Sequence, residues 1–465
     1  MSKKFSLLYD TLNSDSKKNF QKWLFNTYSK HSDLLKYFEI IQQNEYNHST
    51  IYDIIYPNTP FNDKKIRYLS SNIYQALKGY LSSQIPKAYQ HLLLAEATVY
   101  APTAIFEEVQ QDLHDKLVTL PLNTEHYFLE SMSLQMQYKH AVLNGVRDDG
   151  KYAITMLQNL EKYYIAEKLR LSCIIINNGQ VFKYATSGSS ISDDFLDIAK
   201  EVNEVTAFYA KLYLLITTNQ VKIIEIVALL ERILSQFDIW MSKEIFVILQ
   251  NYCIKHLKTG DKDAETILFF LYKLQIESSL LLTNNTLSPW TFKNIVTIAF
   301  RLKEDEWAYQ FMHAYKNYIP KGEQENVYNY NLANYYNRKK NYDKSLALLQ
   351  GVNFTDTFYK IGSKWMISKI YFEKKEWLSL EYALQSFKQL LKREKSLNDD
   401  QKLPYYNQIK HAALLAKAYQ QSISIQKINT IFHSNVPLAE AVWLQEQLQK
   451  YMITRPKRGQ KAITS

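Results

Sequence analysis

The sequence predicts an all-α protein, an α-solenoid of antiparallel helical hairpins, and three observations support this. Helix-breaking residues are scarce over the 465 residues, apolar residues recur at helical spacing, and aromatic residues recur with a regular period in the last third of the chain. Each observation bears on a different level of the fold: the type of element, the face that is buried, and the succession of hairpins.

Glycine and proline number only 10 each. Average usage would be about 7% glycine and about 5% proline. Glycine destabilises a helix through backbone entropy and proline through its missing N–H, so their scarcity indicates long helices joined by short connections. Hydrophobic residues make up 46% of the chain, enough for sizeable cores, and the 22% that are charged argue against global disorder. A β-sandwich or a doubly wound sheet would need more glycines for its turns.

Segments of loop-like composition divide the chain into five predicted parts. These are an N-terminal helical unit (1–85), central helical hairpins (86–185), buried helical hairpins (186–285), a repeat region (286–450) and a basic, disordered tail (451–465). A two-proline turn at 57–60 precedes a helix expected over 64–80, with Asp63 as its cap. The run 177–179 (Asn-Asn-Gly) and the run 187–190 (Ser-Gly-Ser-Ser) indicate a hinge or long connection.

Aromatic residues recur at an interval of 35 in the repeat region. Trp307, Tyr342 and Trp377 are separated by this interval. Upstream of each, another aromatic residue ends an amphipathic run; these are Phe300, Tyr336 and Tyr371. An interval of about 34 residues is typical of tetratricopeptide repeats, in which each unit is a hairpin of helices A and B.

The segment 330–345 resembles a tetratricopeptide unit closely. Leu332 and Ala333 match the pair at which the two helices approach each other. Tyr342 matches the aromatic residue that opens helix B, and Ser345 occupies the site where only a short side chain lets the helices close. The resemblance implies stacked hairpins with a concave face lined by the A helices.

Two degenerate units follow at 367–380 and 415–419, and a weaker one, out of phase by one residue, precedes at Phe300 and Trp307. The resemblance to tetratricopeptide repeats therefore covers about 290–425. A second resemblance concerns the segments 54–80 and 163–173, which look similar to parts of an uncharacterised family of bacterial helical-repeat proteins. This resemblance implies an α-solenoid fold but no known activity.

Four polar residues form the predicted binding site. The residue after the Leu-Ala pair is Asn334, the corresponding positions hold Lys369 and Lys417, and Arg338 lies one helical turn beyond Asn334. In tetratricopeptide domains that bind peptides, an Asn or Lys at this position often contacts backbone or carboxylate, so the resemblance implies the same role here. A net-positive stripe would pair with an acidic or C-terminal carboxylate segment. The alternative is an ordinary solvated helix face.

The sequence contains none of the common motifs for phosphate binding, metal binding or a serine nucleophile. We therefore expect no enzymatic activity and no cofactor, but a scaffold or adaptor that binds a protein or peptide. Cys173 lies on an apolar helix face and is expected to be a buried structural thiol. The acidic run 304–306 is expected to be solvated surface at a hairpin turn.

The formal net charge of +10 is concentrated at the C-terminus. From residue 450 onward there is no acid and there are five basic residues: Lys450, Arg455, Lys457, Arg458 and Lys461. This tail, the 36 tyrosines and a pI near 9.0 support the alternative function, a nucleic-acid-associated helical-repeat protein. The alternative interpretation is that the tail is an ordinary soluble terminus that binds no partner.

The two cysteines belong to no CxxC pair, which is typical of a reducing compartment. The N-terminus lacks the apolar stretch of a signal peptide, and no run of 18 apolar residues is present. We therefore expect a soluble, cytoplasmic protein without a membrane span.

Overall fold

The structure is a computed structural model that describes residues 3–12, 14–43, 47–84, 87–121, 124–146, 150–182, 188–257, 261–350, 356–420 and 436–454. Within these ranges the chain forms helices joined by turns, without a β-strand, so the prediction of an all-α fold is confirmed. The solenoid arrangement stays a prediction. Two compact units divide the chain, Met1–Asn285 and Thr286–Ser465, and the division falls at the boundary predicted after residue 285. The disordered tail was predicted to begin at residue 451, but residues 451–454 are the last residues of the helix Ala441–Thr454; the rest of the tail, from residue 455, lies outside the described residues.

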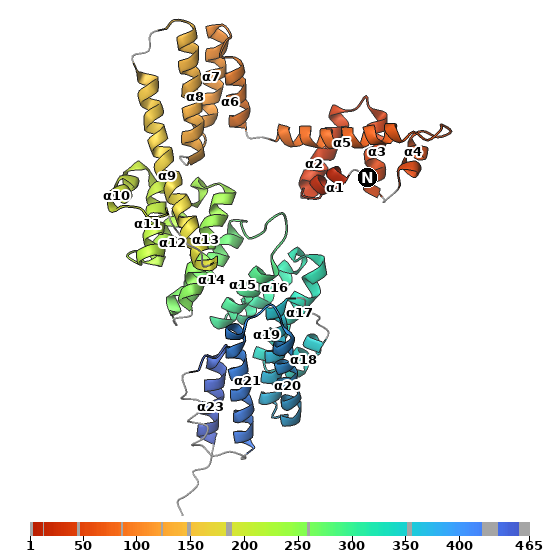
Figure 1. Ribbon diagram of the computed structural model, residues 1–465, viewed down its shortest axis with the longest axis vertical. Coiled ribbons are helices and arrows are strands. Elements are labelled where there is room, and N and C mark those ends of the chain that lie inside the picture. The colour runs from red at the N-terminus through yellow and green to blue at the C-terminus, as the bar shows by residue number, and fades with distance from the viewer. Residues whose placement is uncertain are drawn as a thin grey trace, which may run out of the picture. The chain divides into compact units, whose positions relative to one another are not determined.

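The first unit is built from antiparallel helices of very different lengths (Figure 1). They are α1 (Lys3–Tyr9), α2 (Ser14–Thr27), α3 (Ser32–Gln43), α4 (His48–Ile55), α5 (Asp63–Ser83), α6 (Lys87–Ala97), α7 (Thr103–Leu117), α8 (Thr124–Leu143), α9 (Lys151–Phe182), α10 (Asp193–Val202), α11 (Glu204–Thr218), α12 (Ile223–Ile233), α13 (Ile239–Leu257) and α14 (Lys262–Glu277).

The first five helices enclose a core that is rich in aromatic rings. Phe20 contacts the ring of Phe38 at 5.5 Å between centroids and that of Tyr80 at 5.4 Å. Phe5 completes this cluster, and all four side chains are buried. Aromatic rings bury large areas and prefer edge and tilted contacts, which lets short helices such as α1 and α4 reach a stable core.

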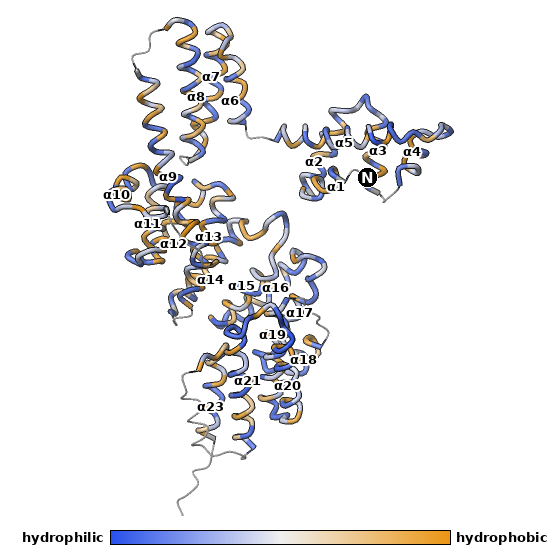
Figure 2. The backbone as a smooth tube through the Cα atoms, viewed as in Figure 1, coloured by the Kyte–Doolittle hydropathy of each residue, from blue (hydrophilic) through white to orange (hydrophobic). Residues whose placement is uncertain are grey.

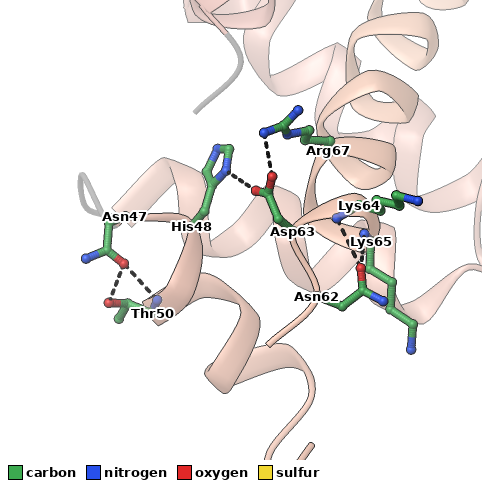
Figure 3. Close-up of polar contacts among 8 residues, drawn as sticks. All are labelled: Asn47, His48, Thr50, Asn62, Asp63, Lys64, Lys65 and Arg67. Atoms are coloured by element: carbon green, nitrogen blue, oxygen red, sulfur yellow. Dashed lines mark hydrogen bonds and ion pairs between the residues drawn. The ribbon is translucent and has the colours of Figure 1, made fainter. Parts of the chain in front are cut away.

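The cap of α5 differs from the prediction. Asp63 was expected to cap this helix, but the cap is Asn62, whose Oδ1 accepts hydrogen bonds from the backbone N–H groups of Lys64 (3.1 Å) and Lys65 (3.4 Å). Asp63 is the first helical residue, and its carboxylate contacts Arg67 at 2.5 Å and His48 at 3.2 Å (Figure 3). Asn and Asp are equally good caps, so sequence alone does not separate adjacent candidates.

Helix α9 is longer than the sequence suggested. The run at 177–179 was expected to belong to a hinge or long connection, yet α9 continues through it to Phe182. Asn251 of α13 donates a hydrogen bond to Asn177 at 3.0 Å, and Gln180 donates one to the backbone carbonyl of Ile216 in α11 at 3.2 Å. Contacts with two other helices therefore stabilise helical structure where local propensity disfavours it. Residues 183–187 lie outside the described residues, whereas Gly188 adopts a positive φ of 83° in the following turn.

The second unit consists of consecutive helical hairpins (Figure 1). Its helices are α15 (Pro289–Arg301), α16 (Asp305–Tyr315), α17 (Lys321–Arg338), α18 (Tyr342–Gln350), α19 (Thr357–Glu373), α20 (Trp377–Arg393), α21 (Asp399–Tyr419) and α23 (Ala441–Thr454). Each helix packs on its hairpin partner. In addition, α15 packs on α17 and α17 packs on α19.

The turns after α15, α17 and α19 share one geometry. Each places a lysine in the left-handed region, with φ values of 63° at Lys303, 59° at Lys340 and 56° at Lys375. The next residue then donates a backbone hydrogen bond to the carbonyl five positions earlier, at 2.9, 2.8 and 3.0 Å for Glu304, Asn341 and Glu376. This is the Schellman pattern that ends many helices, usually with glycine at the left-handed position.

Small residues mark the closest approaches between helices in this unit. Ser345 is fully buried, and its hydroxyl donates a hydrogen bond to the backbone carbonyl of Ala333 at 2.8 Å. The prediction that Ser345 occupies a small-residue site between helices is confirmed. Gly362 of α19 faces the ring of Tyr330 of α17 so closely that a Cβ atom would clash with the Tyr330 hydroxyl.

Apolar and polar residues alternate around the helices in both units (Figure 2). Among the helices of the described ranges, none is both long and apolar enough to cross a bilayer.

Candidate functional site

The four residues of the predicted stripe lie on three helices of the second unit. Asn334 and Arg338 belong to α17, Lys369 to α19 and Lys417 to α21. Helices α17 and α19 pack together, and one apolar core connects α19 with α21.

Arg338 is already bound to a carboxylate of its own chain. Its Nε donates a hydrogen bond to Asp305 Oδ1 of α16 at 2.7 Å, and its guanidinium lies 5.1 Å from the ring centroid of Phe300. Glu306 pairs with Lys339 at 2.9 Å. As predicted, the acidic run lies at the hairpin turn between α15 and α16, and Glu304 and Glu306 are exposed. In addition, Asp305 and Glu306 form ion pairs with the C-terminal end of α17 and the residue after it.

Lys369 also binds a carboxylate of the chain. Its Nζ lies 2.8 Å from Glu440 Oε2, and the Trp365 indole N–H donates a hydrogen bond to the same oxygen at 2.7 Å. Burial opposes ionisation of Glu440, but the Lys369 ammonium and the Trp365 N–H outweigh it and lower the pKa of this carboxyl. The glutamate is held on the face of α19 by the kind of interaction that the sequence predicted for a partner.

The backbone around Glu440 is also recognised. Gln408 Oε1 of α21 accepts a hydrogen bond from the Glu440 N–H at 2.8 Å, and Asn407 donates one to the carbonyl of Pro437 at 3.1 Å. We call residues 436–440 the docked segment. It is non-helical, and amide side chains bind its backbone while Lys369 and Trp365 bind its carboxylate.

The two remaining stripe residues make no such contacts. Asn334 is half-buried and Lys417 is exposed, and neither forms a hydrogen bond or ion pair with another described residue. Two of the four predicted residues are therefore bound to carboxylates of the chain itself, and the other two make no such contact with the described residues.

A second candidate site, in the first unit, was missed by sequence reasoning. A cavity of about 320 Å³ lies between helices α6, α8, α9 and the start of α13. Its lining consists of four aromatic residues and two glutamates: Tyr89, Phe128, Tyr163, Trp240, Glu125 and Glu167. Only Tyr163 and Glu167 fall near a segment singled out from the sequence, 163–173, and nothing in the sequence links them to the others.

Arg170, which also belongs to the segment 163–173, has a structural role. It is buried, with Nη1 2.7 Å from Glu244 Oε2 and Nε 2.9 Å from Glu167 Oε2, and it lies 4.9 Å from the ring centroid of Trp240. Hydrogen bonding to Glu167 outweighs the opposing effect of burial and raises the pKa of the guanidinium, so the charge is permanent. Arg170 neutralises Glu167 and fixes Trp240 against α9.

Glu125 has a different environment. The Tyr89 hydroxyl donates a hydrogen bond to it, but it forms no ion pair with a described lysine or arginine. Burial, assisted by the nearby charge of Asp238, raises the pKa of Glu125. Burial and the hydrogen bond to Glu125 likewise raise the pKa of Tyr89 to about 12.

Another cavity, of about 900 Å³, lies between α2, α3 and α5. Basic residues of its lining include Lys30, His31, Lys64 and Lys65. The only acid of the lining, Asp33, accepts a hydrogen bond from Tyr56 at 2.7 Å. The N-terminal N–H groups of α5 beside this cavity are already bound by Asn62 (Figure 3).

Cys173 and Cys253 are buried free thiols, as expected for Cys173. Burial raises the pKa of Cys173, and it raises that of Cys253 to about 12, so neither is a nucleophile in the folded chain. In the described part of the chain no group of three or more His, Cys, Asp or Glu side chains could hold a metal ion.

Comparison with known proteins gives no relative: no family model, curated protein or solved structure matches the chain.

Proposed function

We propose that the chain is a non-enzymatic, cytoplasmic interaction protein. A protein or peptide binds to the face formed by α17, α19 and α21, which we take to be the A helices of tetratricopeptide-like repeats in an α-solenoid. The observation that carries the proposal is the docked segment, because this face already holds a short segment by the carboxylate of its single acidic residue and by its backbone.

The contacts to the docked segment define the ligand chemistry. A carboxylate that accepts hydrogen bonds from both Lys369 and Trp365 is recognised more strongly than a neutral acceptor, since charge-assisted hydrogen bonds are about twice as strong. Gln408 and Asn407 bind main-chain groups and so tolerate many side chains. A partner would therefore present a non-helical segment with one acidic residue, and exposed Lys417 would add a second charge contact.

The docked segment and a partner would compete for Lys369. A tethered segment has an effective concentration of up to about millimolar, so a partner must displace it or bind beside it. The Glu440 side chain is 49% exposed and the Lys369 side chain 19%, so the ion pair is accessible to solvent from the side of the glutamate.

Two substitutions that break the same ion pair test the proposal. Lys369→Ala and Glu440→Ala each remove one partner, and each should cost about 0.2–1 kcal/mol of stability as expected for an exposed pair. Only Glu440→Ala leaves the lysine free. Capture of a partner from lysate should increase with Glu440→Ala and fall with Lys369→Ala.

Lys374→Ala is the matched control, because it breaks ion pairs with Asp343 and Glu376 in a turn outside the stripe. Equal capture by the Lys369 and Glu440 variants would mean that the pair is only structural and would refute the proposal. Nuclease treatment distinguishes this proposal from the alternative function. Capture that vanishes with nuclease would indicate association with nucleic acid instead of direct binding to a protein.

A further inference from the structure

The cavity between α6, α8, α9 and α13 has aromatic walls. Phe128 and Trp240 are 45% and 50% exposed, although such large apolar side chains are usually more buried. Phe128 lies 6.1 Å from Tyr163 between ring centroids, at an angle of 45°, and Tyr89 lines the cavity from α6. Four rings from four segments of the chain therefore surround one space.

The charge inside this space is negative. Glu125 lines the cavity without an ion pair to a described lysine or arginine, and its carboxyl group is hydrogen-bonded to the Tyr89 hydroxyl and to the side chain of Asp238. The other glutamate, Glu167, is bound by Arg170 from outside the lining. The lining residues include no lysine or arginine, so Glu125 is the acid that a ligand would meet.

The second unit contains an aromatic cluster in which the chain supplies its own cation. Lys293 Nζ lies 5.1 Å from the ring centroid of Trp290, 5.5 Å from that of Tyr330 and 4.7 Å from that of Tyr359. Burial lowers the pKa of this lysine, as expected for an ammonium group surrounded by rings. The cavity of the first unit also has aromatic walls, with a carboxylate in addition. One of its rings, Trp240, is contacted by the guanidinium of Arg170, but no lysine or arginine is among the described lining residues.

We propose that this cavity binds an organic cation, an alkylammonium group that is held by the faces of Tyr163, Trp240 and neighbouring rings and by the carboxylate of Glu125. The faces of aromatic rings are negative and attract cations that shed water easily, which is how quaternary and methylated ammonium groups are recognised. A hard metal ion would require more oxygen ligands than the lining offers. An anion would be repelled by Glu125, and a neutral apolar ligand would bury this carboxylate without a compensating positive charge.

Arg170 acts here as a positioning residue. It contacts Trp240 and is anchored by Glu167 and Glu244, so it sets the orientation of the indole without lining the cavity. The cavity volume of about 320 Å³ suits a small ligand, at the low end of the range for ligand pockets.

Calorimetric titration of the full chain tests the proposal with three probes. Choline supplies a free quaternary ammonium, Nα-acetyl-lysine amide supplies the ammonium of a peptide side chain, and 3,3-dimethylbutanol is the neutral isostere of choline. We expect one or both cations to bind and the neutral isostere to bind at least about tenfold more weakly. The cation that binds more tightly shows whether the ligand is a free quaternary ammonium compound or the ammonium group of a peptide side chain. Binding of neither cation, or equal binding of the neutral isostere, would overturn the proposal.

Two variants place the binding in this cavity. Glu125→Gln and Trp240→Leu should each weaken binding about tenfold or more, whereas Trp290→Leu, in the cluster that holds Lys293, should leave it unchanged. Glu125→Gln should also raise the thermal midpoint, because it removes a charge that burial and Asp238 disfavour. A purely structural glutamate would not combine higher stability with lost binding. Unchanged cation affinity in the Glu125→Gln protein would place the ligand elsewhere and contradict the proposal.

Discussion

Arg170 offers the most quantitative test of the packing around α9. Arg170→Met keeps most of the apolar stem but removes the charge that holds Glu167 and Glu244. Removing one partner of a buried ion pair typically costs about 3–5 kcal/mol, because the other charge stays buried. The Glu167 and Glu244 side chains are 22% and 35% exposed and will regain some hydration, so we expect about 2–4 kcal/mol.

The chain has two compact units, so a single global free energy of unfolding is not well defined. Hydrogen exchange of the backbone amides in α9 and α13 measures local opening instead. A loss of about 2–4 kcal/mol corresponds to exchange that is roughly 30-fold to several-hundred-fold faster.

The triple variant Arg170→Met, Glu167→Gln, Glu244→Gln removes the orphaned charges and should restore most of the protection. Unchanged exchange in Arg170→Met, or a triple variant as unprotected as the single one, would refute this account of Arg170.

Three further predictions concern stability and reactivity. Gly362→Ala should destabilise the contact of α17 with α19 by about 1–3 kcal/mol, because the buried Tyr330 ring must move. Faster exchange of the backbone amides in both helices would show this loss, and unchanged exchange would contradict it. Lys340→Gly should stabilise the turn after α17 by about 0.5–1 kcal/mol, since glycine adopts a φ of 59° without steric cost, whereas Lys340→Ala should give no gain in thermal midpoint. Cys173 and Cys253 should resist a thiol reagent in the folded protein and react after denaturation. Rapid labelling of the native protein would show that these thiols are accessible and would contradict the prediction.

The all-α fold could be predicted because it depends on local properties of the sequence. Few glycines and prolines and apolar residues at helical spacing are sufficient to indicate helices, whatever their neighbours. Burial of Cys173 was predictable for the same reason, since it lies on an apolar helix face, whereas the buried position of Ser345 was predicted from the resemblance to a tetratricopeptide unit.

The errors arose where distant contacts decide the structure. Helix α9 continues through 177–179 because Asn251, more than 70 positions away, satisfies the Asn177 side chain. Arg338 binds Asp305 because two hairpins pack side by side, which no spacing rule for a single helix reveals.

The aromatic cavity could not be predicted at all. Tyr89, Glu125 and Trp240 come together only because α6 packs on α8, α8 on α9 and α9 on α13. None of these residues belongs to a motif, so only the tertiary structure shows that they surround one space.

The docked segment is the centre of the functional account. A labelled peptide with the sequence of residues 436–442 can be added to the full chain and followed by fluorescence anisotropy. The account predicts weak binding to the unmodified chain, whose own segment occupies the site, tighter binding to Glu440→Ala, and no binding to Lys369→Ala. Equal binding by all three proteins, or none by the Glu440→Ala protein, would contradict the claim that this face recognises an acidic segment.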